Sequence, residues 1–316
     1  MPTPAIVTQP DGIFAVDTGY VRPGLAAAHI IRQDGRAAVV DPGTAHAVPD
    51  VLAALDQLGV AREAVDYVFL THVHLDHAGG AGQLMRALPN ARAVLHPRGA
   101  PHLIAPEKLI ASSTAVYGVE RFRALYGEIV PIAAERVQVT SDGERLSLAG
   151  RPFACVHTPG HALHHHCLVD LDHAGIFTGD TFGLSYRELD TEQGAFIVAT
   201  TTPTQFDPAQ LAASVDRLLA YAPQAMYLMH YSRVTDVPRL GAELKGDIHQ
   251  LVDIARTHAG AGDVEARIAA DIRVAWLARA RRHGCALSDA AIAELLDLDV
   301  TLNAQGLVAW LERARR

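Results

Sequence analysis

The sequence has few cysteines, no basic block and no long apolar run. Its 316 residues contain 27 Lys and Arg against 35 Asp and Glu, which gives a formal net charge of -8. Because contacts to phosphates need clustered positive charge, we do not expect nucleic acid as the main partner. No uncharged run reaches the ~20 residues that a membrane span needs, and the first residues lack the basic start and apolar stretch of a signal peptide. We therefore predict a protein that binds neither nucleic acid nor a membrane and lies in the cytoplasm.

Cysteine is scarce, whereas histidine is abundant. The three cysteines, Cys155, Cys167 and Cys285, are odd in number, widely separated and set among apolar residues. A disulfide framework is therefore not expected, and we predict reduced, buried thiols. The 17 histidines stand out, because many of them sit at the ends of predicted strands.

The order of the apolar patterns predicts two strand-rich halves, each followed by helices. The segments GIFAVDTG and HIIRQDGRAAVVDPGT show strand runs broken by Asp-Gly turns. Helical spacing follows at Val51, Leu55 and Leu58, and a short apolar strand then ends at Thr71. Strand patterns resume at about residue 136. Two such halves indicate an α/β fold, an αββα four-layer sandwich with the helices outside and the sheets inside.

The same patterns divide the chain into a main domain and a tail. We predict a catalytic domain at residues 1–235, in which the helical or irregular region 97–136 is an insertion over the site. Residues 236–316 have helical apolar spacing without strand patterns, and we predict a helical C-terminal extension there. Its apolar positions, among them Leu251, Ile272 and Trp276, need burial against the main domain or in a homodimer interface.

Potential metal ligands are concentrated in THVHLDHAGG, which begins at Thr71 and leaves a predicted buried strand. Three histidines and one aspartate fall within six positions: His72, His74, Asp76 and His77. Imidazole nitrogens and carboxylate oxygens suit a divalent ion, and a loop held by a rigid strand can aim several of them inward. The motif therefore predicts a metal-binding loop.

Three later strands end in the same residue types. FACVHTPGH ends at His161, GIFTGD at Asp180 and AMYLMH at His230. Several strand ends converge at one rim of an open sandwich, so residues far apart in sequence can reach a common site. We predict that these three residues join the loop at one metal centre.

These motifs resemble those of the metallo-β-lactamase-fold hydrolase superfamily. The likeness lies in His-x-His-x-Asp-His at residues 72–77, TPGH at 158–161, GD at 179–180 and the late His230. It implies two metal ions, with His72, His74 and His161 on the first, Asp76, His77 and His230 on the second, and Asp180 bridging both. The sequence is similar to broad esterase- and phosphoesterase-like members rather than to true β-lactamases, which usually carry Cys where Asp180 stands.

The two ions that the resemblance implies predict hydrolysis by a metal-activated hydroxide, without a Ser or Cys nucleophile. The predicted substrate is a small ester-type molecule: a phosphoester, a thioester or a lactone. Zinc is the first choice of metal, and Mn or Fe also suits these ligands. Asp76 and Asp180 are predicted to orient the attacking water, and the resemblance places His165 on the pocket side. These three residues are the predicted catalytic set.

Three other residues are candidates near the site. Asp41 ends an early buried strand, where it either orients a ligand histidine from behind or forms the turn before Pro42. Tyr186 and Tyr231 follow ligands in the sequence and are predicted substrate contacts, although aromatic residues at strand ends often belong to the core.

Two other classes of function remain open at this point. The same ligands can hold two iron ions in a redox or sensing protein. The chain can also be a pseudo-enzyme that binds a ligand and signals through its helical tail. The complete set of ligands favours the hydrolase.

Overall fold

The first sheet, built from the N-terminal half, changes from antiparallel to parallel pairing at its fourth strand. The computed structural model describes residues 4–201 and 205–315. The strands lie in sequence order and are β1 (Ile6–Thr8), β2 (Ile13–Asp17), β3 (Ala27–Gln33), β4 (Arg36–Val40), β5 (Val65–Phe69), β6 (Arg92–Leu95) and β7 (Val137–Val139). Pairing from β1 to β4 is antiparallel, and from β4 to β7 it is parallel. Parallel neighbours need crossovers, and these carry the helices α1 (Val48–Gln57), α2 (Leu75–Ala78) and α3 (Ala81–Ala87).

The second sheet has the order β13-β12-β11-β10-β9-β8. Its strands are β8 (Glu144–Leu148), β9 (Arg151–His157), β10 (His166–Asp170), β11 (Gly175–Gly179), β12 (Ala225–Leu228) and β13 (Ser232–Val234). The parallel pair of this sheet, β11 with β12, is connected through helix α7 (Pro208–Leu219). The side chain of Asp207 accepts a hydrogen bond from the backbone N–H of Gln210 and so caps the start of α7.

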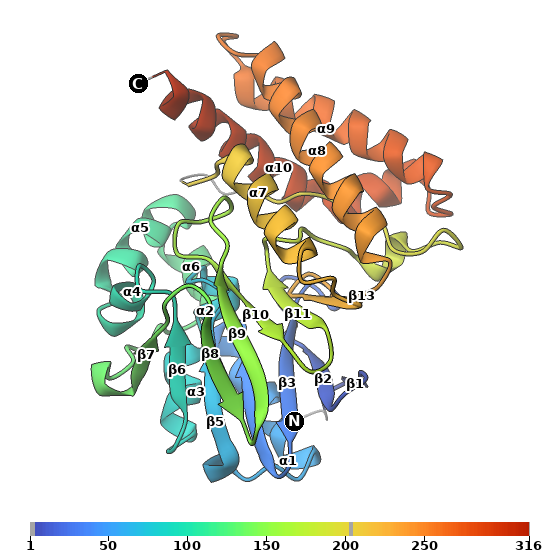
Figure 1. Ribbon diagram of the computed structural model, residues 1–316. Coiled ribbons are helices and arrows are strands. Elements are labelled where there is room, and N and C mark those ends of the chain that lie inside the picture. Colours follow the sequence, from blue (N-terminus) through green and yellow to red (C-terminus); the bar gives the residue numbers. More distant parts are fainter. Residues whose placement is uncertain (1–3, 202–204, 316) are drawn as a thin grey trace.

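Side-chain alternation along the strands produces the four layers seen in Figure 1. Ile30 packs outward against α1 and α3, whereas its neighbour Ile31 packs inward against the second sheet. In the second sheet Cys155 faces inward, and Val156 faces the helices on the other side. Because successive residues of a strand point to opposite faces, both sheets bury both faces. The predicted αββα sandwich is confirmed.

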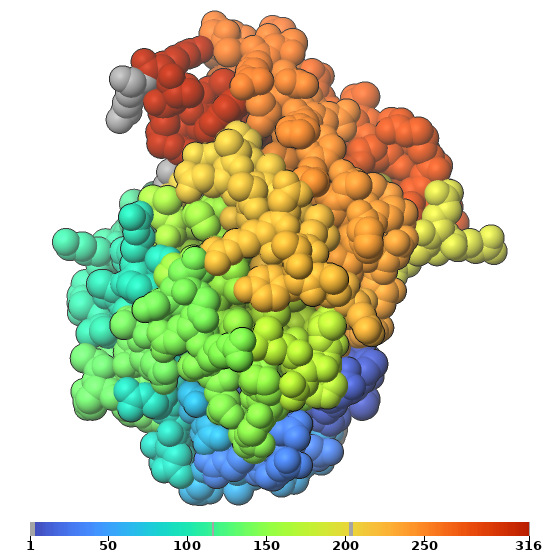
Figure 2. Space-filling model, in the orientation of Figure 1, coloured from blue at the N-terminus to red at the C-terminus, as the bar shows by residue number. Residues whose placement is uncertain are grey.

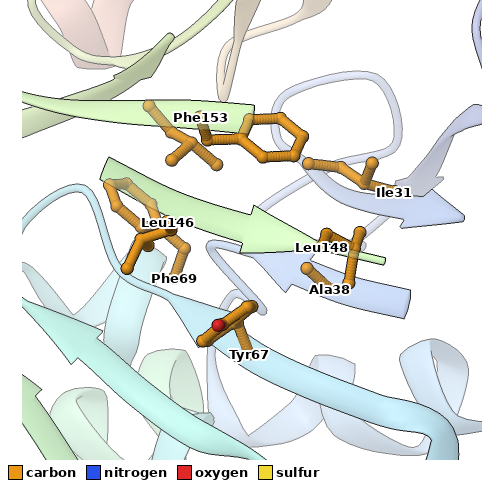
Figure 3. Close-up of a pocket in the computed structure, with 8 residues that line it drawn as sticks. Ile31, Ala38, Tyr67, Phe69, Leu146, Leu148 and Phe153 are labelled. Carbon is orange, nitrogen blue, oxygen red and sulfur yellow. The ribbon is translucent and has the colours of Figure 1, made fainter. Parts of the chain in front are cut away.

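The two sheets meet in an apolar core with one small gap. The gap lies between the strands that carry Ile31, Phe69 and Phe153 (Figure 3), and its volume is about 10 Å³. A space of about one water probe with an apolar lining has no polar partners for a water molecule. It is a packing gap and has no role as a substrate site.

The region between β6 and β7 contains three helices, α4 (Ala100–Ile104), α5 (Glu107–Tyr117) and α6 (Val119–Tyr126). Phe122 and Tyr126 of α6 pack with Ile129 against Leu75 at the start of α2. The region predicted as an insertion, residues 97–136, therefore contacts the short helix that carries Asp76 and His77.

The C-terminal part forms three long helices, α8 (Val237–Thr257), α9 (Val264–Arg282) and α10 (Asp289–Ala314). They lie together beside α7, and Figure 2 shows them as one lobe against the sandwich. Leu251, Ile272 and Trp276 are buried in the cluster that also covers the outer face of the second sheet. The described residues also form the short 3-10 turns η1 (Ala45–Ala47), η2 (Arg62–Ala64), η3 (Ala134–Arg136) and η4 (Arg187–Leu189). Within the same residues, none of the helices has the length and apolar character of a membrane span.

Candidate metal centre

The loop that follows β5 carries four of the predicted ligands, and Asp41 holds it at both ends. Asp41 accepts hydrogen bonds from the backbone N–H of Thr71 at 2.8 Å and from its hydroxyl at 2.7 Å. The Oδ2 atom of Asp41 also lies 2.9 Å from Nδ1 of His77. The structure therefore places Asp41 behind the predicted ligand His77, which agrees with the interpretation that Asp41 orients a ligand histidine. The φ of Asp41, 46°, is also typical of a turn residue, so the interpretation as a turn-former agrees with the structure too.

The other three predicted ligands come from the second sheet. His161 follows β9, Asp180 directly follows β11 and His230 follows β12. All three are buried, and they meet the loop of the first sheet at one rim of the sandwich. The convergence that the sequence pattern predicted is present.

The seven side chains form two adjacent groups. His72, His74, His161 and Asp180 each offer a ligand atom within 4.8 Å of the others, and Asp76, His77 and His230 do the same. Their division matches the one that the resemblance implied for the two ions. The assignment of each residue to an ion remains a prediction.

Asp180 lies between the two groups and presents one carboxylate oxygen to each. Its Oδ2 atom is 3.2 Å from Nε2 of His161, in the first group. Its Oδ1 atom is 3.2 Å from Nε2 of His77 and 3.7 Å from Nε2 of His230, in the second. This is the arrangement that a shared carboxylate needs.

The protonation preferences of these residues follow from burial and from their mutual charges. Burial and the neighbouring His77 lower the pKa of His72 well below its ordinary value, and burial lowers the pKa of His74 to about 3. Burial opposes charge on Asp180, yet His77 and His161 hold the pKa of Asp180 well below its usual range. Neutral imidazoles and ionised carboxylates are the forms that bind cations.

His77 differs from the other histidines in the loop. Burial lowers its pKa, but the surrounding charges of Asp180, Asp76 and Asp41 outweigh burial and raise the pKa well above the ordinary value. Without a metal ion, a proton on His77 compensates the carboxylates around it. The Nε2 atom of His77 and Oδ1 of Asp180 lie 3.2 Å apart, but both are buried and neither makes a hydrogen bond of good geometry. Two such atoms facing each other fit a cation between them, because buried polar groups otherwise find partners.

The nitrogens that face away from this centre contact the protein. Nδ1 of His230 donates to the backbone carbonyl of Leu25 at 2.9 Å, and Nδ1 of His161 donates to that of Thr200 at 3.4 Å. Nδ1 of His77 faces Asp41, as described above. Such contacts hold the ring so that its other nitrogen, Nε2, points into the site.

His165 lies behind this centre and does not face a pocket, which corrects the predicted orientation. Its side chain has no exposed surface. Its Nε2 atom accepts a hydrogen bond from the backbone N–H of Asp180 at 3.2 Å, and its Nδ1 atom lies 2.8 Å from the hydroxyl of Thr158. Both nitrogens thus have protein partners, so His165 supports the backbone of Asp180 instead of contacting a substrate. His165 lies directly before β10, which begins at His166.

The two predicted substrate contacts have different surroundings. Tyr186 is 2% exposed and belongs to the core between the second sheet and the C-terminal helices, where its hydroxyl donates to Oδ1 of Asp299 at 3.1 Å. This burial contradicts the prediction that Tyr186 borders the pocket. Tyr231 is half-buried, and burial together with the negative charge of Asp17 raises the pKa of its phenol to about 12. A substrate contact by Tyr231 remains a prediction.

Sequence reasoning missed Asp299, which α10 brings close to the centre. Burial raises the pKa of Asp299 to about 6. The charge of His230 acts to lower this pKa, and the charge of Asp180 acts to raise it. A pattern in the sequence could have drawn attention to it, because Asp299 lies in the buried stripe of α10 beside Leu296 and Val300. A carboxylate on the apolar face of a helix needs a partner or a function.

Comparisons with known proteins agree with the fold and with these motifs. The Metallo-beta-lactamase superfamily profile matches residues 21–230. A metallo-beta-lactamase fold-containing protein of Sulfurisphaera tokodaii is 25% identical over 223 residues, which cover 69% of this chain and 78% of that protein. A hydroxyacylglutathione hydrolase of Aeromonas hydrophila is 27% identical over 224 residues, or 70% of this chain and 67% of that enzyme.

A solved structure extends the likeness to the C-terminal helices. A metallo-beta-lactamase family protein of Thermus thermophilus has a TM-score of 0.67 and 18% identity, and the match covers 96% of this chain and 94% of that one. At this identity the likeness concerns the fold alone. The profile match, which spans most of the sandwich and all seven predicted ligands, shows that this chain belongs to the metallo-beta-lactamase superfamily.

Proposed function

We propose that this protein is a binuclear metal-dependent hydrolase of small ester-type substrates and that thioesters are the first class to examine. The observation that carries the proposal is Asp180, whose two carboxylate oxygens face two separate groups of ligands. The name of the related hydroxyacylglutathione hydrolase supports a thioester. Phosphoesters and lactones remain alternatives within the same chemistry.

The proposed cofactor is a pair of zinc ions, because nitrogen and carboxylate oxygen ligands suit zinc, with Mn or Fe as alternatives. His72, His74 and His161 would hold the first ion, Asp76, His77 and His230 the second, and Asp180 both. When bound, two such ions polarise a scissile carbonyl and acidify the attacking water. The ionised carboxylates of Asp76 and Asp180 provide acceptors that orient this water.

The surroundings of Asp76 support an acyl-type substrate. The hydroxyls of Tyr20 and Tyr126 lie 3.3 Å apart, and Tyr126 packs with Phe122 in the apolar cluster beside α2. Burial and then the negative charge of Asp76 raise the pKa of Tyr20, so its phenol keeps its proton. The apolar cluster beside α2 is the part of these surroundings that suits the acyl chain of a substrate.

The test combines metal analysis with a substrate panel. Wild-type protein and Asp180→Ala are purified, analysed for metal content, and assayed on thioesters, phosphodiesters and lactones. We expect about two metal ions per chain in the wild type, and loss of metal together with one of the three activities in the variant. Asp172→Ala is the matched control, since Asp172 is an exposed carboxylate in the turn before β11.

Three outcomes would contradict the proposal. If the wild type binds no metal, or if its activity does not depend on Asp180, the chain is not a binuclear hydrolase, and the ligand-binding pseudo-enzyme becomes the leading alternative. Two iron ions with oxygen consumption and no hydrolysis would favour the di-iron redox or sensing protein. The cytoplasmic location and the homodimer remain predictions.

A further inference from the structure

The segment of residues 197–201, which lies outside the named helices and strands, connects the C-terminal helices to the metal centre. The carbonyl of Ile197 accepts a hydrogen bond from Arg279 of α9 at 2.8 Å. The backbone N–H of Ala199 donates to Oδ2 of Asp247 in α8 at 2.8 Å. The hydroxyl of Thr201 donates to the carbonyl of Asn303 in α10 at 3.1 Å. Each of the three helices therefore holds one of three alternate residues of the segment.

The residues between these contacts face the sandwich. Val198 exchanges two backbone hydrogen bonds with Leu184, at 2.9 and 3.0 Å. The carbonyl of Thr200 accepts the hydrogen bond from Nδ1 of His161, whose Nε2 atom lies 3.2 Å from Nδ1 of His74. The contacts of Ala199 and Thr201 flank Thr200 in the chain, so they restrain the position of its carbonyl.

Asp247 is the central residue of this clamp. It is 2% exposed on a helix of the tail, where a carboxylate is costly unless its oxygens have partners. Oδ1 accepts from the indole N–H of Trp276 at 2.9 Å and pairs with the guanidinium of Arg279, while Oδ2 holds Ala199. Arg279 in turn contacts Ile197 and lies over the ring of Phe196, 5.2 Å from its centroid. One carboxylate thus ties α8 and α9 to the segment.

We propose that Asp247 is a positioning residue of the metal centre, which acts through Ala199 and the Thr200 carbonyl to orient His161. On this view the helices α8, α9 and α10 are part of the metal-binding machinery, in addition to their role in packing. The inference rests on the proposed function, because it takes His161 as a metal ligand.

The experiment measures zinc affinity and amide hydrogen exchange of the full-length chain. Asp247→Asn keeps the shape of the side chain but can accept through only one oxygen, and Thr201→Val removes only the hydroxyl contact to Asn303. We expect Asp247→Asn to weaken zinc binding in the first group by about tenfold, the lower end of the loss for a direct partner of a ligand, because Asp247 acts on His161 through Ala199 and Thr200. The kcat should fall while KM stays unchanged. Thr201→Val should show a smaller loss in the same direction.

A second readout uses the wild type alone. If the clamp and His161 are coupled, zinc binding must slow amide exchange at Ala199, because coupling between two sites is reciprocal. This measurement remains decisive if Asp247→Asn fails to fold. The matched control is Arg273→Ala, which breaks an exposed ion pair with Asp297 between α9 and α10. In this control, the zinc affinity and the slowing of amide exchange at Ala199 by zinc should equal those of the wild type.

The outcomes separate this inference from the proposed function. Suppose that the wild type binds two zinc ions and hydrolyses its substrate, that both variants keep the zinc affinity of the wild type, and that zinc does not slow amide exchange at Ala199. This result overturns the positioning role of Asp247 and leaves the proposed hydrolase function intact. A wild type that binds no zinc overturns both. Weaker zinc binding in the two variants, with the control unaffected, supports the positioning role.

Discussion

Asp41 and His77 form a buried contact in which Oδ2 of the carboxylate lies 2.9 Å from Nδ1 of the imidazole. The two residues are 36 positions apart in the chain. With Nδ1 directed at Asp41, the Nε2 atom of His77 faces Oδ1 of Asp180 at 3.2 Å. The contact therefore determines which nitrogen of His77 enters the centre.

The first prediction concerns Asp41→Asn. The Oδ2 atom of Asp41 contacts both the Thr71 hydroxyl and His77, while Oδ1 accepts from the backbone N–H of Thr71. An amide has only one acceptor oxygen, so its NH2 group must face either the Thr71 N–H or the other two donors, and part of this set of contacts is lost. We expect metal affinity to fall about 10–100-fold, measured by chelator competition. Asp34→Asn, an exposed residue in the turn between β3 and β4, is the control. Unchanged affinity in Asp41→Asn would show that Asp41 serves only to form the turn.

The second prediction uses Gly179, the residue before Asp180. A Cβ at Gly179 would lie 2.4 Å from Oγ1 of Thr71 and 2.7 Å from Nε2 of His165, and its φ is +47°. We expect Gly179→Ala to displace Asp180 and to lose metal, as measured by metal content. Gly143→Ala is matched, because Gly143 also has a positive φ of +79° but meets no atom within 4 Å. That control should cost only the ~1–2 kcal/mol of a left-handed backbone, with metal content retained.

The third prediction is a pH dependence of stability that arises from Asp299. Burial raises its pKa from 3.8 to about 6, so in the folded chain it keeps its proton at pH values where the unfolded chain has lost it. The wild type therefore loses stability between about pH 4 and pH 6 through this group, by roughly 3 kcal/mol for a shift of about two units. Asp299→Asn cannot ionise, so the metal-free variant should equal the wild type near pH 4 and exceed it near pH 7.

Urea unfolding of both metal-free proteins across this pH range measures the difference in the free energy of unfolding. A difference that stays constant from about pH 4 to pH 7 would contradict the raised pKa. The Asn side chain can still accept from the hydroxyl of Tyr186, so the hydrogen bond itself is not at issue.

The fourth prediction separates core from substrate contact at Tyr186. Tyr186→Phe removes the hydroxyl that donates to Asp299 and keeps the ring in the core. We expect a loss of about 1 kcal/mol in the free energy of unfolding and an unchanged KM. A raised KM with an unchanged free energy of unfolding would show instead that Tyr186 contacts the substrate.

The sequence by itself determined the layered fold and pointed to the seven predicted ligands. Strand patterns on both sides of residues 97–136 have apolar residues on both faces, which requires helices outside two stacked sheets. His72, His74, Asp76 and His77 are close in space because they are close in the chain. His161, Asp180 and His230 could be assigned because each follows a strand, and the ends of these strands meet at one rim.

Only the tertiary structure decided what stands behind and around these ligands. His165 and Tyr186 follow ligand motifs in sequence, yet both are buried, because their strands and loops turn these side chains into the protein. Asp247 and Asp299 lie in helices that the sequence marked only as an amphipathic tail. Their contacts to Ala199 and Tyr186 span 48 and 113 positions. Local periodicity determines which face of a helix is buried, but the partner of a buried carboxylate depends on how separate elements pack together.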